Sequence, residues 1–451
     1  MDSHHALLIA KVHPAGPEAL PHTVFYNFQK NAHLGARFHP IHSKRGIDIL
    51  YGTGGILTQE LQISGDIAAC SAIFHIEEEQ IMNVMNFLVS IFFCLGALDY
   101  FLGNRFGLGK PFLDGLESII ELLILMTGFM VLAPWMGSVL GSLTGPIFRS
   151  VGCDPSLIAG IFMSCDGGAA VLADSMALSH EAAQFNGMIV GAFLGITFVF
   201  TIPFALTHSQ GEKQEAAVKG LLVGIFIIPA GCFITGCLAK LPVTTIMANL
   251  WPVALFSAVL LILFLFCRNH IVSVFQKISA FIRGIALAGF GIEVLSETAG
   301  LTLLPELTPF QEVFPIITGI SVFLAGILPL MTLIQRILQK PLHTVSGILN
   351  IQPDSVVSMI LSLANPIPVF LSFDKLDVKG CFLVTAFLTP AGFAVGDHLA
   401  FALQYSPDIA IPLMTGKILT GCIAFLLAFF LAPVLLGTPA DAHTRTSQAC
   451  R

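Results

Sequence analysis

Two short polar motifs interrupt apolar stretches of this chain and hold side chains suited to binding a small charged solute. Residues 164–168 read Ser-Cys-Asp-Gly-Gly, and residues 364–368 read Ala-Asn-Pro-Ile-Pro. In the first motif Asp166 offers a carboxylate, Ser164 a hydroxyl, and the glycines Gly167 and Gly168 allow close backbone approach. Asn365 offers a neutral amide at the matching place of the second. This pairing predicts a site for a small, cationic, hydrogen-bonding solute, with a helix-capping carboxylate as the alternative interpretation of Asp166.

Three further ionisable residues lie in apolar surroundings. Burying such a group in a membrane span is costly, so each is a candidate functional residue. Asp397 is the second candidate ligand for a cation, and His398 could titrate near neutral pH, as an unperturbed imidazole does; the alternative is that this pair is solvated near the outer end of its helix. Lys417 is a candidate charge partner of Asp397, or else its side chain snorkels to a surface.

The elements that carry the two motifs are duplicated. Pro134 and Pro146 precede the first motif, and Pro329 and Pro341 precede the second with the same spacing of twelve. In each copy an apolar helix is followed by a short amphipathic piece and then by the interrupted apolar run. Duplicated broken helices within a hydrophobic chain indicate the binding site of a transporter.

The composition is that of a polytopic membrane protein. The chain has 451 residues, 55% hydrophobic and 11% charged, with a mean hydropathy of +0.85. The net charge of −7 argues against a nucleic-acid partner. The 10 cysteines form no CxxC pair and no ligand-spaced cluster with histidine, so we predict no metal site, no disulfide framework and no cofactor.

The predicted fold is an all-α polytopic membrane protein. A bilayer core takes about 20 apolar residues per helix, and about nine such spans follow residue 82. They are 85–103, 116–138, 183–206, 217–239, 246–267, 280–300, 310–335, 379–404 and 409–436. Two interrupted pieces remain, about 154–179 and 354–373. If both are re-entrant hairpins, most lysines and arginines of the connecting segments fall on one side, which the positive-inside rule makes cytoplasmic.

This orientation relates two halves of the chain as inverted repeats. Repeat 1 covers 82–240 and repeat 2 covers 280–437, with a linking span and cytoplasmic loop at 241–279 and a cytoplasmic tail at 438–451. Residues 1–81 hold no spanning segment and stay unassigned. A small extra domain is one interpretation of them; the simpler one, which we prefer, is a translation start placed too far upstream of Met82 or Met85.

From about Met82 to the last span, the chain resembles the bacterial ethanolamine utilisation permease family. The matching motifs are Leu98-Asp99, Leu132-Ala133-Pro134, Pro155-Ser156-Leu157-Ile158-Ala159-Gly160, Cys165-Asp166-Gly167-Gly168, Lys340-Pro341-Leu342, Leu363-Ala364-Asn365, Ile367-Pro368, Gly396-Asp397-His398-Leu399 and Gly416-Lys417. The resemblance implies a multi-pass protein of the bacterial cytoplasmic membrane that admits ethanolamine as a carbon and nitrogen source. Two features depart from the family pattern: Pro366 stands where a second Asn is expected, and Glu293 and Glu297 occupy a span that is generally apolar.

We therefore predict a transporter or facilitator, not an enzyme, for uptake of protonated ethanolamine through the lipid bilayer. Asp166 first and Asp397 second would bind the ammonium, and Asn365 or Ser164 the hydroxyl. A proton- or sodium-coupled carrier of another small solute is the alternative. An intramembrane aspartyl protease using the two aspartates is disfavoured, because residues 394–397 read Ala-Val-Gly-Asp and lack the GxGD pattern. The sequence leaves a homo-oligomer open.

Overall fold

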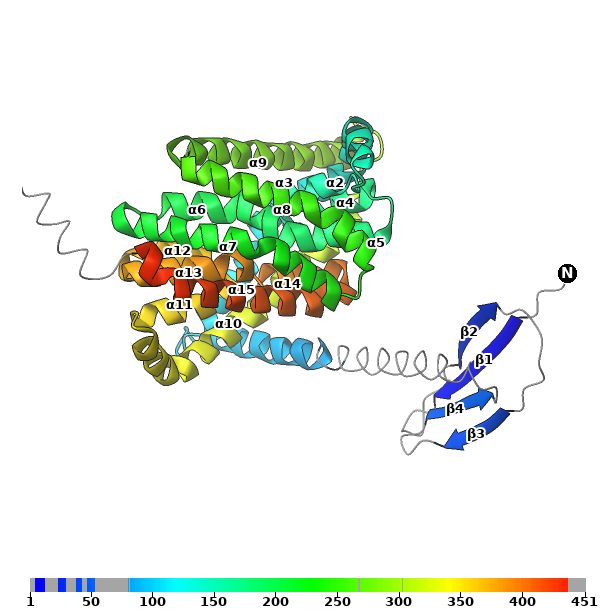
Figure 1. Ribbon diagram of the computed structural model, residues 1–451, viewed down its shortest axis with the longest axis horizontal. Coiled ribbons are helices and arrows are strands. Elements are labelled where there is room, and N and C mark those ends of the chain that lie inside the picture. The colour runs from blue at the N-terminus through cyan, green and yellow to red at the C-terminus, as the bar shows by residue number, and fades with distance from the viewer. Residues whose placement is uncertain are drawn as a thin grey trace, which may run out of the picture. The chain divides into compact units, whose positions relative to one another are not determined.

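The computed structural model describes residues 5–12, 23–29, 38–42, 47–52, 80, 82–266, 268–301 and 303–436. The chain divides into two units, Met1–Asn83 and Val84–Arg451. The first unit, within the segment that the sequence left unassigned, contains a four-stranded antiparallel sheet of order β2-β1-β4-β3 (Figure 1). Its strands are β1 (His5–Val12), β2 (Thr23–Gln29), β3 (Phe38–His42) and β4 (Ile47–Gly52).

Helices are the only regular elements among the described residues of the second unit, which confirms the predicted all-α class for this part of the chain. Its first half comprises the helix Met82–Phe101, α2 (Gly109–Ser150), α3 (Leu157–Phe162), the π-helical turn η1 (Cys165–Ala169), α4 (Ala170–Met176), α5 (His180–Ala183), the π-helices η2 (Gln184–Gly195) and η3 (Thr197–Thr201), α6 (Ile202–Thr207) and α7 (Gly211–Leu238). Its second half comprises α8 (Val243–Phe266), α9 (Arg268–Ala299), α10 (Phe310–Leu349), α11 (Pro353–Ala364), α12 (Ile367–Leu371), the 3-10 turn η4 (Phe373–Lys375), α13 (Val378–Ala391), α14 (Asp397–Tyr405) and α15 (Pro407–Leu436).

Within the described residues, 7 helices are long and apolar enough to cross a membrane. They match seven of the predicted spans, and they are Met82–Phe101, Gly109–Ser150, His180–Thr207, Gly211–Leu238, Val243–Phe264, Phe310–Leu338 and Pro407–Leu436. The predicted span 280–300 is helical within α9 but is not among the seven, and the predicted span 379–404 is broken in two. The count of nine spans therefore stays a prediction.

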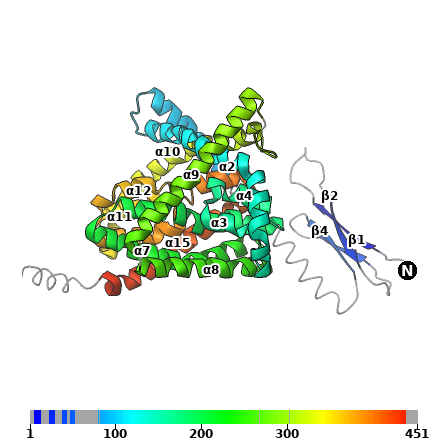
Figure 2. The same cartoon turned by 90° about the horizontal axis from the view of Figure 1, so that it is seen from above.

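The core of the bundle surrounds α13. This helix packs against both α7 and α15, which also contact each other, and the three lie side by side in Figure 1. Every residue from Gly380 to Ala391 is buried, as expected for a helix that is apolar on all sides. In contrast, α8 exposes large apolar side chains such as Trp251 and Leu255, and such a face suits contact with lipid. Figure 2 shows α9 running obliquely to α7 and α8.

The two longest helices, α2 and α10, contain the duplicated prolines and pack against each other. Each continues through both of its prolines, Pro134 and Pro146 in α2 and Pro329 and Pro341 in α10. The amphipathic pieces predicted as separate elements are therefore the C-terminal parts of these helices. Proline removes one backbone hydrogen bond, but helices packed within a membrane protein tolerate that loss.

Each interrupted run folds back so that its two ends meet. In the first hairpin, made of α3, η1 and α4, Asp154 Oδ2 accepts a hydrogen bond from the Leu178 N–H at 2.9 Å. In the second hairpin, made of α11 and α12, Asp377 Oδ1 accepts one from the Gln352 N–H at 3.1 Å. An aspartate thus closes the base of each hairpin, as a re-entrant geometry requires. Their entry from opposite faces of the bilayer, and so the inverted repeat, stays a prediction.

Candidate functional site

Hydrogen bonds and glycine conformation shape the tip of the first hairpin. Ser164 is extended, and its Oγ accepts a hydrogen bond from the Gly167 N–H at 2.9 Å. Gly168 has a φ of +108°, which favours glycine, and a Cβ there would lie 2.6 Å from Phe129 Cβ. The break therefore requires the residue types of the motif, and it holds Asp166 at the first turn of η1 with its side chain 16% exposed.

Three glycines spaced four apart pack the first hairpin against η2. A Cβ on Gly187 would lie 2.7 Å from Ala173 Cβ, and one on Gly191 would lie 2.9 Å from the Cys165 N atom. A Cβ on Gly195 would collide with the Met163 carbonyl oxygen. The Gly-x₃-Gly-x₃-Gly spacing is a signal for close helix packing that the sequence analysis missed. It could have identified η2 as the partner of the hairpin tip.

The second half of the chain reaches the same region through a broken helix. Residues 392–396 separate α13 from α14, so the prediction of a continuous span over 379–404 is wrong. The Phe393 N–H donates to the Ser362 carbonyl at 3.0 Å, and the Val395 N–H donates to the Leu363 carbonyl at 2.8 Å. These bonds to the end of α11 replace the helical ones, and Phe393 takes a left-handed φ of +62°. The second hairpin thereby sets the position where α14 begins.

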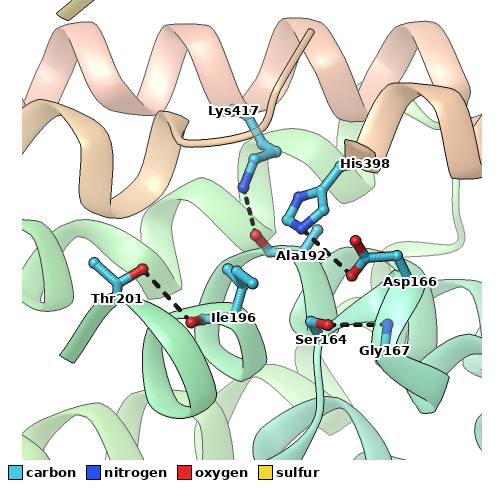
Figure 3. Close-up of polar contacts among 8 residues, drawn as sticks. All are labelled: Ser164, Asp166, Gly167, Ala192, Ile196, Thr201, His398 and Lys417. Atoms are coloured by element: carbon cyan, nitrogen blue, oxygen red, sulfur yellow. Dashed lines mark hydrogen bonds and ion pairs between the residues drawn. The ribbon is translucent and has the colours of Figure 1, made fainter. Parts of the chain in front are cut away.

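Asp166 and His398 meet at this point. His398, the second residue of α14, has a side chain 1% exposed, and its Nε2 lies 3.7 Å from Asp166 Oδ1 (Figure 3). Asp166 Oδ1 and both ring nitrogens of His398 are buried without a hydrogen-bond partner among the described residues. Each such atom costs about 1–3 kcal/mol, so a ligand that bonds to them gains free energy. The alternative of a solvated histidine at a helix end is wrong.

Lys417 approaches this pair from the middle of α15. Its side chain is fully buried, so the snorkelling alternative is wrong. The ammonium donates to the Ala192 carbonyl of η2 and lies 4.9 Å from the centre of the Phe193 ring. In Figure 3 the His398 ring points toward Asp166, and the Lys417 ammonium beside it points toward the Ala192 carbonyl. The predicted pairing of Lys417 with Asp397 stays a prediction.

The remaining predicted residues lie at the edges of this cluster. Asn365 ends α11, and its Oδ1 accepts a hydrogen bond from the Ile367 N–H at 2.9 Å, so it stabilises the break in the second hairpin. No hydrogen bond or ion pair among the described residues joins it to Asp166. Asp397 is half-buried at the first position of α14. The predicted facing of carboxylate and amide is thus replaced, for the described contacts, by Asp166 facing His398.

One member of the cluster was not predicted as functional. Ligand atoms of Cys165, Asp166 and His398 all lie within 4.8 Å of one another, an arrangement that suits a metal ion. Sequence spacing could not reveal this group, because its histidine comes from the other half of the chain. Asp154 and Asp377, which close the two hairpins, were missed as well. Each lies beside apolar residues and resembles an ordinary turn or capping residue in sequence.

Apolar helices long enough to cross a bilayer, with unpartnered polar atoms buried where two helices break, define a membrane transport protein. The family model described as "Ethanolamine utilisation protein, EutH" matches residues 81–431, and the chain belongs to this family. It is a multi-pass bacterial membrane protein.

The chain matches its curated relatives over nearly their whole length. A probable ethanolamine permease EutH of Listeria monocytogenes is 32% identical over 352 residues, which is 78% of this chain and 94% of the relative. The uncharacterized protein YxeR of Bacillus subtilis is 29% identical over 77% of this chain and 94% of its own length. A probable ethanolamine permease EutH of Salmonella typhimurium is 29% identical over 78% of this chain and 96% of its own length. No solved structure matches the chain.

Proposed function

We propose that this protein carries protonated ethanolamine across the bacterial membrane, with Asp166 binding the ammonium and His398 the hydroxyl. The observation that carries the proposal is the buried set of unpartnered atoms, Asp166 Oδ1 and the two ring nitrogens of His398. Of these, Asp166 Oδ1 and His398 Nε2 lie 3.7 Å apart. The names of the Listeria and Salmonella relatives supply the solute.

The chemistry of the two sides matches. A carboxylate only accepts hydrogen bonds, whereas an ammonium offers three donors, and a charge-assisted bond between them is stronger than a neutral one. A neutral imidazole has one donor and one acceptor, as a hydroxyl does. Ser164 Oγ already accepts from Gly167 but keeps its own proton to donate, so it is the second candidate for the hydroxyl.

The first hairpin joins its own half of the bundle to the site, and α14 and α15 bring the other half to it. A carrier that alternates access must separate such elements on one side at a time. Asp397, at the start of α14, is the second candidate for the ammonium along that path. An inside-negative potential favours entry of a monocation by about 2.3 kcal/mol per 100 mV, so a uniporter of the charged amine needs no separate energy source.

The test is uptake of labelled ethanolamine by the full chain in proteoliposomes. Asp166→Asn keeps the side chain's shape and removes its charge, so we expect uptake to fall to background while the protein still inserts. Asp114→Asn is the matched control, because Asp114 is exposed on α2, and it should transport normally. Full uptake by Asp166→Asn would refute the binding assignment. Competition by excess choline, nucleosides or dicarboxylates tests the solute.

Proton coupling is the second candidate mechanism, because His398 and Lys417 at the site are side chains that can bind and release a proton. Uptake at several external pH values, with the membrane potential intact or collapsed, separates the two. A uniporter of the cation loses accumulation when the potential collapses at any pH. A proton-coupled carrier keeps accumulating as long as a pH gradient remains.

A further inference from the structure

We propose that Cys165, Asp166 and His398 form a binding site for a thiophilic divalent cation such as Zn²⁺ or Cd²⁺. The three residues offer a sulfur, a carboxylate oxygen and an imidazole nitrogen, all within 4.8 Å of one another. Cys165 is fully buried, and the two ring nitrogens of His398 have no hydrogen-bond partner among the described residues. Nothing in the described contacts of the histidine therefore competes with a metal.

The spacing is close to what tetrahedral zinc needs. Bonds of about 2.3 Å to sulfur and 2.0 Å to nitrogen or oxygen place ligand atoms about 3.5 Å apart. Asp166 Oδ1 and His398 Nε2 are already 3.7 Å apart. The sulfur must approach by up to about 1.3 Å, given the 4.8 Å limit of the cluster. Cys165 lies at the start of η1, directly after the extended break at Ser164.

The charges and the ligand types select the ion. Thiolate and carboxylate together carry two negative charges, which a divalent cation neutralises; the thiol proton is released to water on binding. Sulfur and imidazole favour Zn²⁺ and Cd²⁺, whereas Mg²⁺ and Ca²⁺ prefer sites built from oxygen. The ammonium of Lys417 lies beside His398 and donates to the Ala192 carbonyl (Figure 3). It weakens metal binding by repulsion, so removing its charge should tighten it.

The metal site shares two residues with the proposed substrate site. An ion held by Asp166 and His398 occupies the groups assigned to the ammonium and the hydroxyl, so metal and ethanolamine exclude each other. This consequence, and only this one, rests on the proposed function. It predicts that Zn²⁺ or Cd²⁺ blocks uptake competitively and that a chelator restores it.

Metal binding is measured on the purified full chain by equilibrium dialysis with radiolabelled Cd²⁺. We expect one ion per chain with a cadmium–thiolate absorption band in the ultraviolet. Cys165→Ser and His398→Gln should each weaken binding by at least about tenfold, and Lys417→Met should strengthen it. Cys381→Ser is the matched control, since Cys381 is equally buried in α13 and lies outside the cluster. Its binding should equal that of the original chain.

Cys165→Ala serves as a second variant, with circular dichroism confirming that each variant is folded. Binding that is absent, or that is the same in folded Cys165→Ser and Cys165→Ala as in the original chain, overturns the metal site. Uptake in proteoliposomes with and without Zn²⁺ tests the consequence separately. A chain that binds cadmium but carries no ethanolamine would refute the proposed function and keep the metal site. A chain that transports ethanolamine but binds no metal would refute the metal site and keep the proposed function.

Discussion

The base of the first hairpin allows a stability prediction worked from its contacts. Asp154 is buried, and its Oδ1 accepts hydrogen bonds from the Ser156 N–H at 2.9 Å and the Ser156 hydroxyl at 2.6 Å. Its Oδ2 accepts from the Leu178 N–H at the other end of the hairpin. The Asn186 amide donates to the same Ser156 hydroxyl at 2.9 Å, which ties this network to η2.

Replacing Asp154 by alanine strands two buried donors of Ser156 and the part-buried N–H of Leu178. A buried donor left without an acceptor costs about 1–3 kcal/mol, so Asp154→Ala should lower the free energy of unfolding by about 3–6 kcal/mol. Asp154→Asn keeps one oxygen and should lose about 1–3 kcal/mol. Asp377 is half-buried, and its two bonds, to the Gln352 N–H and the Ser355 hydroxyl, are both 3.1 Å long. Water can replace them, so Asp377→Ala should cost about 1 kcal/mol.

Denaturant unfolding of the purified chain in detergent, followed by circular dichroism, gives these values. Asp114→Ala is the control, because an exposed surface change is usually within about 0.5 kcal/mol. The expected order of destabilisation is Asp154→Ala, then Asp154→Asn, then Asp377→Ala. The reasoning fails if the free energy of unfolding of Asp154→Ala lies within 1 kcal/mol of that of the original chain, or if Asp154→Ala destabilises the chain less than Asp377→Ala does. Either result would mean that the hydrogen bonds at the hairpin base do not hold it closed.

Three further predictions concern transport. Lys417→Met leaves the Ala192 carbonyl without its donor and should lower the free energy of unfolding by about 1–3 kcal/mol. In the folded variant, checked by circular dichroism, the KM for ethanolamine should fall several-fold because a cation near the ammonium is removed, and an unchanged KM would contradict this. Gly168→Ala should abolish uptake and destabilise the chain by about 2–4 kcal/mol, because the new Cβ meets Phe129 in a left-handed backbone; Gly152→Ala, left-handed but with open space around it, should cost only about 1–2 kcal/mol. Deleting residues 1–81 should leave proteoliposome uptake unchanged, because the family match begins at residue 81, and a chain that inserts but no longer transports would contradict this.

Hydropathy predicted most of the helices because a membrane span is defined by a property that local composition carries. The observed helix His180–Thr207 differs from the predicted span 183–206 by a few residues, and Pro407–Leu436 differs from 409–436 by two at its start. The two interrupted runs were also recognised, since proline, glycine and polar residues together mark a helix break. The closure of each run by an aspartate was not predicted, because it depends on which backbone N–H groups the fold brings near that carboxylate.

The break between α13 and α14 could not be predicted from the local sequence. Residues 392–396 read Gly-Phe-Ala-Val-Gly, which is apolar enough to continue a span. The segment leaves the helix because the last turn of α11 offers carbonyl acceptors to Phe393 and Val395. A Cβ on Gly396 would collide with the Ala364 carbonyl, so the close approach also needs glycine. Only the tertiary partner reveals this break, and without it His398 is placed on the wrong helix.

The two polar motifs of the sequence have different roles in the structure. The first carries side chains into the site, where Asp166 and Cys165 lie near His398. In the second motif the polar side chain is used within the motif, because Asn365 Oδ1 accepts a hydrogen bond from the Ile367 N–H. The end of α11 binds the backbone of the segment that leads into α14. The second motif therefore acts on the site through the position of His398. A substitution there, Pro366 included, should alter binding by moving the imidazole rather than by removing a ligand, so it should change affinity for ethanolamine and for cadmium in the same direction.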